Sequence, residues 1–186
     1  MRVLIYRLSA LWGKQKLSRQ EYVRALQSVI DGMKPVQTVL TEKGLWKAFG
    51  NEWSEHREQE GIDACSIHIL DFQDAHNRLR SIKPESPLFG VQATALMASQ
   101  AYFETIASYV EYRRMFLSAD YRTKRYMKVQ RDVRQWDRIA HEEASKLIKE
   151  LCGVSPVQIP ESLTEIATEF EDFGIGIGHR YVMMMD

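Results

Sequence analysis

The sequence has little cysteine and no net charge. Its two cysteines, Cys65 and Cys152, lie far apart in 186 residues, and no Cys-x-x-Cys or Cys/His cluster occurs. This spacing argues against a structural zinc site and a disulfide framework, and it predicts small buried thiols in a reduced cytoplasmic protein. Lysine plus arginine total 25, as do aspartate plus glutamate. Only a local patch of the surface is therefore suited to binding a polyanion.

Long hydrophobic runs are also missing. No stretch approaches the roughly 20 apolar residues that a membrane-spanning helix needs. The apolar run in residues 1–16 is interrupted by Arg7 and lacks the small-residue cleavage site of a signal peptide. We therefore expect an amphipathic helix there, and a cytoplasmic location.

The common catalytic loops are absent from the sequence. There is neither a Gly-x-Ser-x-Gly nucleophile elbow nor a Gly-Lys-Ser/Thr phosphate loop. The glycines of residues 174–178 follow a predicted helix rather than a strand, so they lack the context of a nucleotide loop. Cys152 lies at a predicted helix C-terminus, where the helix dipole disfavours a thiolate. We expect no enzymatic activity, no cofactor and no small-molecule substrate.

A weak alternative is a metal-dependent bundle enzyme that uses carboxylates and histidines. Helical di-metal sites combine single glutamates with Glu-x-x-His motifs. In this chain the carboxylate and the histidine are instead four residues apart, so the sequence predicts no metal site. The nearest candidates are Glu52 with His56, Asp137 with His141, and Glu104 alone on a long helix.

Helical signals cover nearly the whole chain. Ser18 and Glu21 have the spacing of a capping box, in which each side chain accepts a hydrogen bond from the other residue's backbone N–H. Gly32 is predicted to end the helix that follows, and Pro35 to open the next one. A lone histidine at position 56 shares its predicted helical stripe with Phe49 and Trp53.

Residues 62–82 are predicted to form one helix that ends at Lys83-Pro84. Its buried stripe is expected to contain Cys65, Ile69, Phe72, His76 and Leu79.

The next segment is unusual in its length without a helix breaker. Ser86-Pro87 is a helix-start signal, and no glycine or proline occurs from Val91 to Cys152. A continuous helix there would be about 93 Å long at 1.5 Å per residue, so we expect either one rod or two helices joined near 118–120. Ser118 and Asp120 are the candidate caps.

The predicted fold is therefore all-α. It is a single-domain helical bundle over residues 1–173, with a long central helix or kinked helix pair at about 88–152. A last helix after Pro160 should carry the apolar stripe Leu163, Ile166, Phe170 and Phe173. Residues 174–186 read as a glycine-punctuated, flexible tail.

Charge is divided along the C-terminal half of the chain. Residues 111–138 carry 9 basic and 4 acidic side chains, whereas residues 139–186 carry 3 and 9. On a helical wheel six of the cations fall within about a third of the circumference, opposite Met115, Val129, Val133 and Trp136. They are Arg113, Lys124, Lys128, Arg131, Arg134 and Arg138. The aromatic residues Tyr112, Phe116 and Tyr121 flank them and are candidates for stacking on bases.

This pattern predicts a non-catalytic helical subunit of a larger assembly. Its basic helix face (113–138) would contact a nucleic-acid backbone or an acidic partner surface, so the expected partners are another protein or a second copy, and then nucleic acid. One alternative is a peripheral membrane-binding helical dimer that uses the same face on an anionic membrane surface. The other is a merely solvated face, or one docked on Glu165, Glu169 and Asp172 of the last helix.

Overall fold

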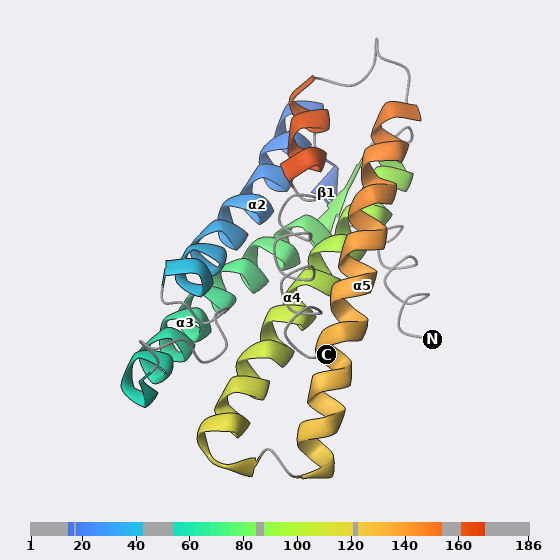
Figure 1. The fold of residues 1–186 in the computed structure, drawn as a ribbon. Helices are drawn as coiled ribbons and strands as arrows, with labels where there is room; N and C mark the ends of the chain where they lie inside the picture. The colour runs from blue at the N-terminus through green and yellow to red at the C-terminus, as the bar shows by residue number, and fades with distance from the viewer. Residues whose placement is uncertain are drawn as a thin grey trace.

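The computed structural model describes residues 15–16, 18–42, 54–84, 88–120, 123–153 and 161–169. These residues form five helices and one very short pair of strands, which confirms the all-α class. The long helices are α2 (Arg19–Glu42), α3 (Glu55–Ser81), α4 (Phe89–Leu117) and α5 (Lys124–Gly153). Residues 161–169 form a further short helix beside α2, and a contact of 3.8 Å joins Glu169 to Lys34 of α2 (Figure 1).

The order of packing follows the order of the chain. Helix α2 packs on α3, α3 on α4, and α4 on α5, so α4 lies between its two neighbours (Figure 1). One cluster of buried apolar side chains draws on all four long helices and on residues 161–169. Leu163 and Ile166 belong to it, as the stripe predicted, while Phe170 and Phe173 lie outside the described residues.

Helix α2 begins as the capping box predicts. The backbone N–H of Ser18 donates to Glu21 Oε2 at 2.8 Å, and the N–H of Glu21 donates to Ser18 Oγ at 3.4 Å. Two sites that were predicted to break the helix do not, because α2 continues through Gly32 and Pro35.

Glycine 32 serves close packing instead of termination. A Cβ at this position would lie 3.1 Å from the Cα of Phe72 on α3, so a larger residue would push the two backbones apart. Pro35 removes one helical hydrogen bond. The fully buried side chains of Met33 and Val36 hold the helix on either side of it.

Ser54 is the N-cap of helix α3, and its hydroxyl accepts a hydrogen bond from the N–H of Arg57 at 3.3 Å. Cys65, Phe72, His76 and Leu79 are buried, and Ile69 is partly buried against them, as the stripe predicted. His56 does not lie on an apolar face; its side chain is 84% exposed and contacts Glu60.

Two further predictions from the sequence need correction. The strand β1 (Gln15–Lys16) pairs in parallel with β2 (Ile82–Lys83), whereas a helix was expected over residues 1–16. Two residues are too few to show an alternating pattern. Cys152 is exposed rather than buried, while Cys65 is buried and its pKa rises to about 12 because of desolvation. The N-terminal residues 1–14 and the tail 174–186 lie outside the described part of the chain.

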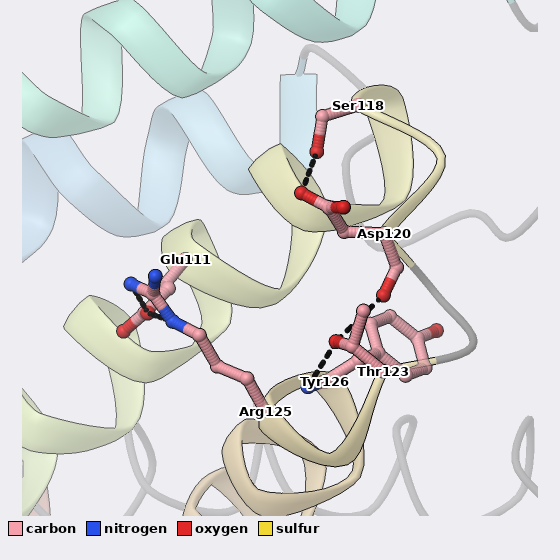
Figure 2. Close-up of polar contacts among 6 residues, drawn as sticks. All are labelled: Glu111, Ser118, Asp120, Thr123, Arg125 and Tyr126. Atoms are coloured by element: carbon pink, nitrogen blue, oxygen red, sulfur yellow. Dashed lines mark hydrogen bonds and ion pairs between the residues drawn. The ribbon is translucent and has the colours of Figure 1, made fainter.

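The segment without glycine or proline is a helix pair, and the chain reverses direction between α4 and α5 (Figure 1). Ala119 adopts a left-handed conformation with φ 60°, and the Ser118 hydroxyl donates to Asp120 Oδ2 at 2.9 Å. The cap of α5 is Thr123, which accepts from the N–H of Tyr126 at 3.1 Å (Figure 2). The break therefore lies where it was expected, but neither Ser118 nor Asp120 caps α5.

Candidate interaction surface

Helix α5 has one buried side and one exposed side. Val129 and Val133 are buried against the core, as predicted, Trp136 is partly buried there, and Met115 is buried on α4. The buried side continues through Ala140, Ala144, Leu147 and Leu151. Because this side packs on α4, the opposite side of α5 faces solvent.

Five of the six predicted cations lie on that exposed side. We call them the α5 basic face: Lys124, Lys128, Arg131, Arg134 and Arg138. The first and last of them are 14 positions apart, or about 21 Å of helix at 1.5 Å per residue. Arg138 lies 3.7 Å from Glu142, and both side chains are exposed. Among the described residues, no carboxylate forms an ion pair with the other four.

Arg113 is the exception, and its placement on the basic face was wrong. It belongs to α4, is 4% exposed, and forms an ion pair with the equally buried Glu58 of α3. Its guanidinium also lies 5.8 Å from the ring centroid of Phe116. The single helical wheel failed here because the chain turns at 118–120, so Arg113 and Lys124 lie on different helices.

Tyr112, one of the predicted flanking aromatic residues, packs on other tyrosines. Tyr112 stacks on Tyr126 of α5 with 4.9 Å between ring centroids, and on Tyr109 at 6.3 Å. Burial is the largest cause that raises the pKa of Tyr126, followed by its hydrogen bond with Tyr112. These rings join α4 to α5 instead of lining the basic face, and Phe116 is partly buried. Tyr121 lies outside the described residues.

The basic face is narrow, and carboxylates border it. On one side Arg125 donates to Glu111 of α4 at 2.6 Å, which fixes α5 to α4 near the turn (Figure 2). Asp132 is partly exposed beside the face, and Glu142 ends it. Asp137 is largely buried, and this burial raises its pKa to about 6.

One side chain in this face was missed by the sequence reasoning. Met127 is 52% exposed and lies among the cations, one helical turn from Lys124 and Arg131. The same measure of exposure identifies Ile67 and Leu70 on α3, at 65% and 61%. A wheel drawn for α3 would have found the latter pair.

The candidate metal ligands are not brought together. Within the described ranges, no group of three or more His, Cys, Asp or Glu side chains is arranged to hold a metal ion. Glu104 accepts from Gln100 at 2.9 Å, while His141 is exposed on α5. His56 contacts Glu60, and Glu52 lies outside the described residues.

The last helix does not cover the basic face. Glu169 contacts Lys34 on α2, and Glu165 is exposed. Asp172 lies outside the described residues. None of the described helices has both the length and the apolar composition needed to cross a bilayer.

Comparison of the chain with protein families, curated proteins and solved structures gave no match.

Proposed function

We propose that this protein is a non-catalytic subunit of an assembly and that its α5 basic face docks on an acidic protein surface. The observation that supports this is the line of five exposed cations around Met127, on a helix whose other side packs into the core. Opposite charge steers and orients a partner. An apolar residue within the contact adds to the binding free energy because it is removed from water.

The shape of the face favours a protein partner over nucleic acid. A nucleic-acid duplex is wider than one helix and would also approach the bordering carboxylates Asp132 and Glu142. Tyr112, one of the rings expected to stack on bases, packs instead on Tyr126 between α4 and α5. An exposed methionine contributes little to binding phosphates but is common in protein interfaces.

The test is binding of fluorescent polyglutamate, compared with a DNA duplex and with phosphatidylserine vesicles. The triple variant Lys124→Glu, Lys128→Glu, Arg131→Glu should lose polyglutamate binding. A matched variant reverses three exposed cations elsewhere, Arg24→Glu, Arg80→Glu and Lys83→Glu, and should bind like the native protein.

The relative affinities for the three probes at one salt concentration separate the partner classes. Binding of polyglutamate should weaken as salt screens the exposed charges. Tighter binding to the DNA duplex or to the vesicles than to polyglutamate at about 150 mM salt would contradict a protein partner. Equal polyglutamate binding by both triple variants would place the contact outside α5.

A further inference from the structure

Helix α3 presents an exposed face of the opposite charge. Four carboxylates recur on one side of it, and Ile67 and Leu70 lie between the first two and the last two. We call these four residues the α3 acidic face: Glu60, Asp63, Asp71 and Asp74. An apolar pair exposed within a charged stripe is typical of a surface that another protein covers.

We infer that the acidic surface bound by the α5 basic face is the α3 acidic face of a second copy of this chain. This inference rests on the function proposed above and names its partner. The two faces have equal lengths, because the ends of each are 14 positions apart, or about 21 Å of helix. A chain with a formal net charge of zero meets little overall repulsion from its own copies.

The residue spacing favours antiparallel docking of the two helices. If Asp74 lies opposite Lys124 and the helices run in opposite directions, Glu60 falls opposite Arg138. The inner charges then also meet their opposites. The resulting pairs are Asp74 with Lys124, Asp71 with Lys128, Asp63 with Arg134, and Glu60 with Arg138.

The apolar residues distinguish this register from the parallel one. Antiparallel docking places Met127 at the level of Asp71 and one residue from Leu70, close enough for the two exposed apolar side chains to bury each other. Parallel docking pairs the charges about as well but places Met127 opposite Asp63. Beyond the ends of the two faces, the antiparallel register also places His56 opposite Glu142.

Three of these carboxylates already make contacts on the surface. His56 contacts Glu60 at 3.2 Å, His68 contacts Asp71 at 4.0 Å, and Gln59 donates to Asp63 at 2.9 Å. Exposed contacts of this kind contribute little to stability. Replacing them by contacts with the charges of a second copy therefore costs little free energy.

The positions of the faces define the type of assembly. Helices α3 and α5 pack on different sides of α4 (Figure 1), and the α5 basic face lies opposite the buried side of α5 that packs on α4. Because the two faces belong to helices on different sides of α4, we expect each copy to contact one neighbour through α5 and another through α3. Such head-to-tail contacts produce rings or open chains rather than a closed two-fold dimer.

The experiment is sedimentation velocity on the full chain with complementary charge reversals. The α5 variant is Lys124→Glu, Lys128→Glu, Arg131→Glu, and the α3 variant is Asp63→Lys, Asp71→Lys, Asp74→Lys. Each alone should associate about 100-fold or more weakly than the native protein, because like charges then meet at every contact. An equal mixture of the two variants should associate again, because both junctions regain opposite charges.

Unfolding curves for each variant establish that loss of association is not loss of fold. The reversal of Arg24, Arg80 and Lys83 should associate like the native chain, and native association should weaken between about 50 and 500 mM salt. A monomeric native protein at low salt, or a mixture of the variants that stays monomeric, would overturn the inference. If the α5 variant still loses polyglutamate binding in that case, the proposed function stands with a different acidic partner; if polyglutamate binding is also unaffected, both fail.

Discussion

Helices α4 and α5 are neighbours of similar length, 29 and 30 residues, yet their surroundings differ completely. Helix α4 is covered by α3 on one side and α5 on the other, so it buries polar residues such as Gln92, Ser99 and Arg113. Among the described helices, α5 packs extensively on α4 alone. An arginine on α4 therefore needs a partner inside the protein, whereas an arginine on α5 is available to a partner outside.

The largest expected effect is on the buried pair of α4. Replacing Glu58 with Ala leaves the Arg113 charge buried without its carboxylate, which should lower the free energy of unfolding by about 3 to 5 kcal/mol. Denaturant titration measures this loss. Arg131→Ala on α5 is the contrasting variant and should change stability by less than about 0.5 kcal/mol. Similar losses in both variants would remove the distinction between the two helices.

A buried histidine beside α4 gives the next largest effect. His76 Nδ1 lies 2.7 Å from Ser99 Oγ, and burial, with Arg80 nearby, lowers its pKa to about 4. In the unfolded chain the histidine binds its proton at a higher pH than in the folded protein. The neutral, buried His76 therefore contributes fully to the unfolding free energy above pH 6.5, and about 3 kcal/mol of that free energy is lost as pH falls to 4.

The measurement compares unfolding free energies of the native protein and His76→Gln from pH 7.5 to 4. The native protein should lose more stability than the variant over that range. His141→Gln, at an exposed position on α5, is the control and should retain the native pH dependence. A His76→Gln profile parallel to the native one would contradict the assignment.

Asp137 shows that α5 also carries one charge on its inner side. Burial raises its pKa to about 6, so folding favours its protonated form, and this contribution is lost as pH rises from 3.8 through 6. Asp137→Asn should therefore raise the unfolding free energy at pH 7.5. Because the side chain keeps some contact with solvent, we expect about 1 kcal/mol rather than the roughly 3 kcal/mol of the full shift. This gain in unfolding free energy should become smaller toward pH 4. Thermal unfolding of the native protein and the variant at pH 7.5 and pH 4 measures it. A loss of stability in the variant at pH 7.5 would show that the carboxylate is needed.

The smallest effect on stability is expected from Met127→Ala and Leu70→Ala. Both side chains are largely exposed, so each change should alter the unfolding free energy by less than about 0.5 kcal/mol. Self-association should nevertheless weaken severalfold in each single variant. The double variant should weaken self-association by less than the product of the two single fold-changes, because the residues contact each other in the proposed register. Strictly multiplicative effects would argue against the antiparallel alignment.

Local signals in the sequence were sufficient where neighbours played little part. The capping box at Ser18 and Glu21, the buried stripe of α3 and the break near Ser118 follow from the chemistry of a few adjacent residues. The β1–β2 pairing was not predictable, because its partners are far apart in sequence and each is two residues long. Gly32 was wrongly predicted to end a helix. A glycine is needed there because the backbone of Phe72 packs against it, and Phe72 lies on another helix.

The sequence alone determined that this protein is helical and that α5 has an apolar and a basic side, because helical periodicity is a local property. Only the tertiary structure decided which charges remain exposed. It removed Arg113 from the basic face by pairing it with Glu58, and it left Met127, Ile67 and Leu70 at the surface. Exposure depends on which elements pack together, and that is a property of the whole chain rather than of any one helix.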